Sequence, residues 1–304
     1  MSGSHIRLAA AGLLLFSSLT ATPALAVSVF ACEPEWGALA AEIAGPEAQV
    51  FTATTAQQDP HHIEARPSLI ARLRGADLLI CTGAGLEEGW LPQLLEQAGN
   101  PRVQPGQPGY FLATDGMTLL EQPTALDRAQ GDVHAQGNPH VHLDPRRMRT
   151  VARALGERLV QVDTTQAASH QQRAEAFDAH WRELESRWTQ QAVPLKGLPV
   201  AVLHGNWAYL EDWLGLSRVA VLEPKPGLPP SAGHLATVLQ GLNRRPARLV
   251  LAAPHEDPKP TQWLAEQAGI PRVLLPYTVG GSAQARSLGA LFEETMRLLL
   301  EHAR

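Results

Sequence analysis

The chain has 304 residues, of which 44% are hydrophobic and 18% are charged, and this composition is that of an ordinary globular protein. The formal net charge of −5 argues against the basic surface that nucleic-acid-binding proteins present, so no nucleic-acid partner is expected. Beyond the N-terminal segment, no apolar run approaches the roughly 20 residues that a transmembrane helix requires.

The N-terminal segment has the three parts of a secretory signal peptide. Arg7 is followed by an apolar run at residues 8–19, and residues 22–26 (TPALA) form a small-residue cleavage pattern. The alternative is a buried N-terminal helix, which the cleavage pattern disfavours. Residues 1–26 are therefore predicted to be a signal peptide. No lipobox cysteine follows, so the mature chain is expected to be free in a periplasm.

The first half of the mature chain alternates short apolar runs with helical patterns. Strands are predicted at residues 27–32, 49–54 and 76–81, and helices at 36–43 and 67–73. This alternation predicts a parallel sheet covered on both faces. In a doubly wound sheet of order 2-1-3-4 the first and third strands are neighbours. Cys32 and Cys81 end those strands, so either a disulfide or two buried thiols is expected.

A long helix is predicted in the middle of the chain. Residues 165–192 contain no Gly or Pro, and apolar side chains recur at helical spacing, which gives a helix of about 42 Å. The α/β alternation then resumes and ends in a helix at residues 288–302. The predicted organisation is therefore α/β, with an N-terminal metal-binding lobe (27–163), a connecting helix (164–193) and a C-terminal metal-binding lobe (194–304).

The sequence contains twelve histidines, and the candidate functional residues are among them. Those at His170, His180 and His302 lie on predicted helices among charged residues and are expected to be solvated. Three other sites follow apolar strand-like runs or lie in loops, where open α/β sheets bind ligands: His61 with His62, His140 with His142, and His204.

The spacing within these sites limits which histidines can act together. Adjacent side chains cannot easily face one ion, so at most one of His61 and His62 is expected to be a ligand. The i, i+2 spacing of His140 and His142 puts both on one face of an extended segment. Neutral imidazole suits Zn²⁺ and other borderline first-row metals, so the three sites together predict a metal site.

Four ordered segments resemble the solute-binding proteins of zinc and manganese ABC importers, the ZnuA/TroA-like family. They are residues 59–61 (DPH) with 66–68 (RPS), 139–145 (PHVHLDP), 204–215 (HGNWAYLEDWLG), and 223–224 (EP) with 229–231 (PPS). The resemblance covers essentially the whole mature chain. In the second segment His142 stands where the family usually has tryptophan.

The resemblance implies a fold and a function. The fold would be two Rossmann-like lobes joined by the long helix, and His61, His140 and His204 would bind the metal in the cleft between them. The protein would be a monomeric periplasmic receptor, not an enzyme. It would deliver Zn²⁺ to the permease of an ABC importer in the inner membrane, with a periplasmic metallochaperone as a further candidate partner.

Two departures from the family concern the remaining ligand. The late loop at residues 275–281 lacks the acid that often serves as the fourth ligand, which favours Zn²⁺ over Mn²⁺ because Mn²⁺ prefers oxygen ligands. Water, His142 and the loop 255–257 with its histidine and carboxylates remain open as the fourth ligand. The loop at 127–136 is short and carries Asp127, Asp132 and His134, so either a secondary metal contact or a solvated loop is expected.

Other functions are also compatible with this sequence. Three histidines with an open position also describe a catalytic zinc, but the sequence contains no H-E-x-x-H motif, which disfavours a periplasmic zinc hydrolase. A manganese receptor, a metallochaperone or an adhesin-like relative on the same fold stays open, because the fold does not decide function.

Overall fold

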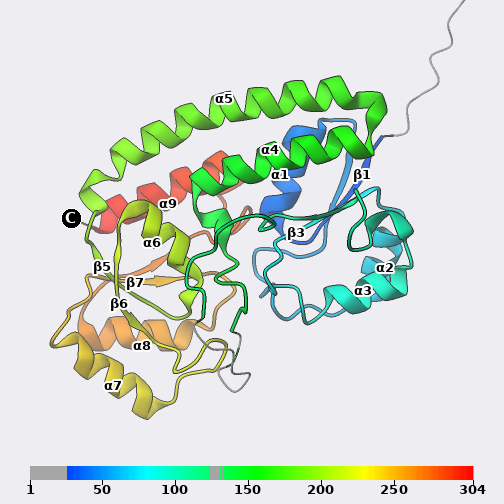
Figure 1. Ribbon diagram of the computed structural model, residues 1–304. Coiled ribbons are helices and arrows are strands. Elements are labelled where there is room, and N and C mark those ends of the chain that lie inside the picture. Colours follow the sequence, from blue (N-terminus) through cyan, green and yellow to red (C-terminus); the bar gives the residue numbers. More distant parts are fainter. Residues whose placement is uncertain (1–25, 124–130, 132, 304) are drawn as a thin grey trace, which may run out of the picture.

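The structure is a computed structural model that describes residues 26–123, 131 and 133–303. Two α/β lobes lie side by side beneath one long helix (Figure 1). Within the described ranges, no helix combines the length and apolar character needed to cross a bilayer. The predicted signal peptide, except Ala26, lies outside these ranges, as do Asp127 and Asp132.

The N-terminal lobe is built on a four-stranded parallel sheet of order β2-β1-β3-β4, which confirms the predicted 2-1-3 arrangement. Its strands are β1 (Ser28–Ala31), β2 (Gln49–Thr52), β3 (Leu78–Cys81) and β4 (Tyr110–Leu112). Its helices are α1 (Pro34–Ala44), α2 (Pro67–Arg74), α3 (Leu91–Ala98) and α4 (Pro145–Val162).

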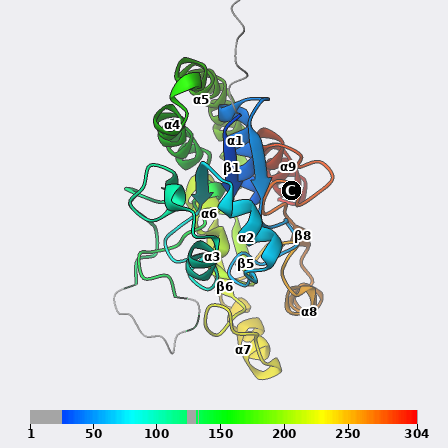
Figure 2. The same ribbon diagram turned by 90° about the vertical axis from the view of Figure 1, so that its right-hand side faces the viewer.

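The C-terminal lobe repeats this plan with a parallel sheet of order β6-β5-β7-β8. Its strands are β5 (Pro199–Val202), β6 (Ser217–Val221), β7 (Leu249–Ala252) and β8 (Arg272–Leu274). Its helices are α6 (Ala208–Leu214), α7 (Ala232–Leu242), α8 (Pro258–Ala268) and α9 (Leu288–His302). In the view of Figure 2, α4 and α5 lie side by side at the upper left, next to α1, and α7 lies at the bottom, at the opposite end of the molecule.

Alternation along the strands divides each lobe into two apolar layers. In β1, Val29 and Ala31 pack in a core with α1, α4 and α5, whereas Phe30 packs with α2 and α3. Successive side chains of a strand point to opposite faces, so a strand buried on both faces is apolar throughout. The first core continues through α9 to Val200 of β5 and Leu249 of β7, so the two lobes share one apolar interior.

The connecting helix α5 runs from Ala167 to Gln191 and passes along both lobes (Figure 1). It begins two residues later than predicted, because residues 164–166 form a 3₁₀ turn. Trp181 and Trp188 pack against Phe292 of α9 at ring-centroid distances of 5.6 and 5.2 Å. These large buried rings anchor the connector to the C-terminal lobe.

His170, at the start of α5, was expected to be solvated, and this expectation is wrong. The side chain is 1% exposed, and its Nε2 lies 2.9 Å from a carboxylate oxygen of Asp163. Arg173 contacts its Nδ1 at 2.8 Å and also donates to the backbone carbonyls at the end of α1. Burial is possible because both ring nitrogens have partners.

The two cysteines form a disulfide. Cys32 and Cys81 lie at the carboxyl ends of the neighbouring strands β1 and β3, with their Cα atoms 4.8 Å apart. Both are fully buried beneath α2 and α3. Of the two alternatives left open by the sequence, the structure contains the disulfide.

Candidate metal site between the lobes

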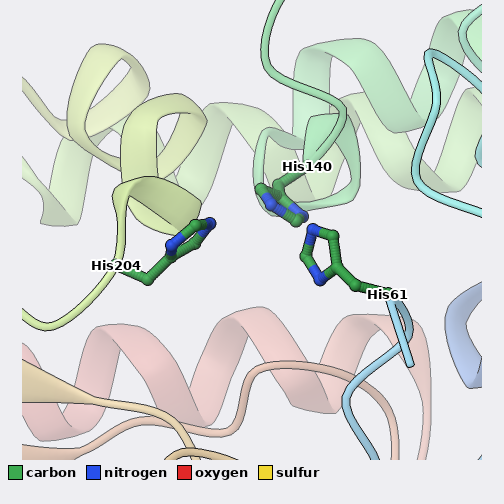
Figure 3. Close-up of side chains that lie close together, drawn as sticks. All are labelled: His61, His140 and His204. Atoms are coloured by element: carbon green, nitrogen blue, oxygen red, sulfur yellow. The ribbon is translucent and has the colours of Figure 1, made fainter. Parts of the chain in front are cut away.

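Three histidines from distant parts of the sequence meet between the lobes. His61 lies in the loop between β2 and α2, His140 lies just before α4, and His204 follows β5. Their ring centroids are 5.6 to 6.1 Å apart, and one ring nitrogen from each lies within 4.8 Å of the other two. Figure 3 shows the three rings converging on one point.

Local capping fixes the turn that carries His140. Asp144 caps α4 by accepting a hydrogen bond from the Arg146 amide at 2.8 Å, and Pro145 takes the first helical position. Asn138 accepts a hydrogen bond from the His140 amide at 3.1 Å. The same side chain donates to the Gly205 carbonyl of the C-terminal lobe at 2.8 Å. One amide therefore ties the segment of His140 to that of His204.

Each of the three rings is held at Nδ1 by a polar partner. His61 Nδ1 lies 2.7 Å from Asp59, His204 Nδ1 lies 2.6 Å from Glu223, and His140 Nδ1 lies 2.5 Å from the Tyr277 hydroxyl. Partners at one nitrogen fix the tautomer and the orientation of a ligating imidazole. This arrangement leaves the Nε2 atoms for the centre, and His140 Nε2 is buried without a hydrogen-bond partner among the described residues.

The electrostatic surroundings of the three histidines differ. Burial and the neighbouring histidines hold the pKa of His140 well below its usual range, so this ring is neutral. Burial also opposes protonation of His204, but the hydrogen bond and charge of Glu223 outweigh it and raise the pKa of this ring. Burial alone would raise the pKa of Asp59, but the hydrogen bonds and charge of His61 outweigh burial, and the pKa is lowered overall. The Asp59 carboxylate is therefore ionised, and His61 Nδ1 donates to it.

A cavity of about 180 Å³ opens beside the three rings and is lined by both lobes. Its C-terminal wall includes His255 and Glu256. Burial lowers the pKa of His255 to about 4 and raises that of Glu256 to about 7. The Glu256 carboxylate accepts hydrogen bonds from the Ala253 amide and the Asn206 side chain, so it has partners outside the cluster.

The remaining sequence candidates have different places. His62 is exposed and is not part of the cluster of ligand atoms. His142 is buried: its Nε2 lies 3.1 Å from the Tyr277 carbonyl, and its Nδ1 lies 3.3 Å from the Glu35 carboxylate without a hydrogen bond among the described residues. Asp257 caps α8 by accepting from the Lys259 amide. Among the described residues, none of these brings an unoccupied ligand atom into the group of three histidines.

Sequence reasoning missed one residue beside the site and left the role of another open. Tyr277 is 4% exposed and contacts His140, and the only sequence signal was its place in the loop where an acid was expected. His134 lies in the loop that was expected to be either solvated or a secondary metal contact; it is partly buried, and its Nε2 lies 3.2 Å from His61 Nε2. Burial and the nearby His61 and His204 lower the pKa of His134 to about 3, so it is a neutral ring.

The chain matches, over residues 29–301, the family described as zinc-uptake complex component A, periplasmic (ZnuA). The chain belongs to this family. The resemblance noted in the sequence is thereby confirmed, and the ZnuA family is one of solute-binding components rather than enzymes.

The curated relatives described next have low sequence identity to this chain. The high-affinity zinc uptake system protein ZnuA of Yersinia pestis is 25% identical over 211 residues, which is 66% of either protein. The zinc-binding lipoprotein AdcA of Streptococcus pneumoniae strain R6 is 22% identical over 233 residues, covering 75% of this chain and 45% of AdcA. The chain thus spans about half the length of the AdcA proteins that it matches.

Solved structures confirm the fold expected for the ZnuA family. A crystal structure of ZnuA superposes with a TM-score of 0.73 at 21% identity, covering 90% of this chain and 99% of that one. A manganese-bound periplasmic metal-binding protein from Candidatus Liberibacter asiaticus gives 0.73 at 15% identity, with coverage of 91% and 100%. The two α/β lobes and the long connector are therefore shared by proteins of low sequence identity.

Proposed function

We propose that this chain is the periplasmic receptor that captures Zn²⁺ and delivers it to an ABC importer in the inner membrane. His61, His140 and His204 bind the ion as it is carried. The observation that carries this proposal is that each ring is held by a partner at Nδ1 while one nitrogen of each lies within 4.8 Å of the others. Ligands at 2.0–2.1 Å from a tetrahedral zinc are about 3.3 Å apart, so a small inward movement completes the site.

The donor set favours zinc over manganese. The three proposed ligands are imidazoles, and the nearest acids, Asp59 and Glu223, are engaged as partners of His61 and His204. Zn²⁺ accepts nitrogen ligands readily, whereas Mn²⁺ prefers carboxylate, carbonyl and water oxygens. The curated relatives in Yersinia pestis and Streptococcus pneumoniae are named for zinc uptake and zinc binding, which supports the same choice.

The domain plan follows from this function. Residues 1–26 act as the export signal, residues 27–163 and 194–304 form the two lobes, and residues 164–193 connect them. His61 and His140 belong to the first lobe and His204 to the second, so the ion bridges the cleft. The mature protein acts as a monomer that docks on the permease, and a periplasmic metallochaperone is a further candidate source of its metal.

Competition between metals tests the proposal. Metal-stripped protein is dialysed against equal concentrations of Zn²⁺ and Mn²⁺, and the bound metal is measured by elemental analysis. We expect zinc almost exclusively, and His180→Ala, an exposed histidine on α5, should load equally well. Preferential loading with manganese would contradict the choice of metal, and failure to retain either ion would contradict the receptor function.

A further inference from the structure

We propose that His134 is the fourth metal ligand, which would make the site an all-imidazole tetrahedron. This inference rests on the proposed function, because it concerns the same ion. The observation behind it is the distance of 3.2 Å between His134 Nε2 and His61 Nε2. Adjacent corners of a zinc tetrahedron with Zn–N distances of 2.0–2.1 Å are about 3.3 Å apart.

The partner at Nδ1 leaves the Nε2 atom of His61 facing His134. His61 Nδ1 lies 2.7 Å from the Asp59 carboxylate and donates to it, so Nε2 is the ring nitrogen available to a metal ion. His134 Nδ1 lies beside the turn at residues 83–85, since a Cβ placed on Gly85 would be 3.6 Å away from it, and its Nε2 is the atom that faces His61. Two ring nitrogens 3.2 Å apart repel each other unless a proton or a cation lies between them, and a metal ion would serve both.

The turn that receives His134 has an unusual backbone. Gly83, Ala84 and Gly85, which follow β3 after one intervening residue, all have positive φ, at 83°, 53° and 87°. Two glycines adopt this conformation without strain and allow a tight turn at the carboxyl end of the strand. This turn packs beside His134 Nδ1 and limits how the imidazole can rotate.

Both lobes hold the segment that carries His134. Gly131 lies against the Pro226 carbonyl of the C-terminal lobe so closely that a side chain at this position would have no room. The His134 ring stacks near His61, with centroids 5.3 Å apart, and faces His140 edge-on at 6.1 Å. The His134 ring therefore neighbours two of the three proposed ligands, and its Nε2 must move to come within 4.8 Å of all three.

Other candidates for the fourth position fit less well. His142 Nε2 lies 3.1 Å from the Tyr277 carbonyl and its Nδ1 lies 3.3 Å from the Glu35 carboxylate, and neither nitrogen belongs to the described group of ligand atoms. His255 lines the cavity and its Nδ1 is buried without a hydrogen-bond partner, but among the described residues its nitrogens do not belong to the group of ligand atoms within 4.8 Å of one another. A fourth imidazole also removes the last oxygen position, which strengthens the discrimination against Mn²⁺.

Cobalt spectroscopy and zinc competition test this assignment in the full mature chain. Co²⁺ in a tetrahedral nitrogen site gives intense visible bands, which weaken and shift when water replaces one imidazole. His134→Ala should show this change and should bind zinc about 10- to 100-fold more weakly than the wild type. His61→Ala should lose more affinity, whereas His180→Ala should match the wild type in both readouts.

The outcomes separate the two proposals. If His134→Ala keeps the wild-type cobalt spectrum and zinc affinity, His134 is not a ligand, and the receptor function is untouched. If the wild-type chain binds neither ion, both proposals fail. Equal thermal stability of the metal-free wild type and His134→Ala would assign the loss of affinity to the ligand rather than to misfolding.

Discussion

Tyr277→Phe is the change that most sharply tests how the site is held. The phenol hydroxyl lies 2.5 Å from His140 Nδ1, and the ring is buried against His142 and His255 at centroid distances of 4.9 and 4.7 Å. Burial and nearby acids raise the pKa of Tyr277 well above its usual range, so the hydroxyl stays neutral. Phenylalanine keeps the packing and removes only the partner of His140.

Two effects are expected, and they can be measured separately. Loss of a hydrogen-bond partner behind a ligating histidine typically weakens metal binding 10- to 100-fold, which is about 1.4–2.7 kcal/mol. The buried Nδ1 of His140 is also left unsatisfied, which costs the metal-free fold about 1–3 kcal/mol. Competition with a chelating dye gives the first quantity, and denaturant unfolding of stripped Tyr277→Phe protein gives the second.

Tyr110→Phe is the matched control, because Tyr110 lies on the outer strand β4 of the N-terminal lobe. It should leave zinc affinity unchanged. Wild-type zinc affinity in Tyr277→Phe would refute the idea that this hydroxyl orients His140, even if stability fell as expected.

Three further predictions concern the ligands and the connector. His61→Ala should weaken zinc binding by orders of magnitude and His62→Ala by much less. Equal losses of affinity in the two zinc titrations would contradict the assignment of His61 as the ligand. Because Glu223 raises the pKa of His204, zinc competes with a proton there, so affinity should fall on acidification, and Glu223→Gln should move that fall to lower pH. A pH series of zinc titrations checks this, and an unmoved profile counts against the pairing. Small-angle scattering should show little change in radius of gyration on zinc loading, since α5 and the shared core stiffen the molecule; a large drop would mean that the connector bends.

Most of the architecture could be predicted from the sequence because buried parallel strands are apolar throughout and alternate with helical patterns. The strand order and the position of α5 followed from those patterns. The strand β4 (Tyr110–Leu112) was missed because it has only three residues and follows a stretch rich in glycine and proline. The start of α5 was misplaced because no Gly or Pro separates residues 165 and 166 from the helix, although they belong to a 3₁₀ turn.

The candidate site was predicted only where local sequence carries a signal. His61, His140 and His204 follow strand-like or motif segments, and the structure brings them together. His134 stands alone in a polar loop, and its approach to His61 depends on the tertiary fold, so no local pattern indicates it. The contact between Tyr277 and His140 joins residues 137 positions apart and has no sequence signature for the same reason.

The central claim is that Zn²⁺ binds between the lobes through the imidazoles of His61, His140 and His204. Zinc X-ray absorption spectroscopy of the loaded protein tests it most directly, with His140→Ala for comparison. The account predicts a first shell dominated by imidazole nitrogen at about 2.0–2.1 Å in the wild type, and loss of bound zinc in the variant. A first shell dominated by oxygen, or zinc retained unchanged by His140→Ala, would contradict it.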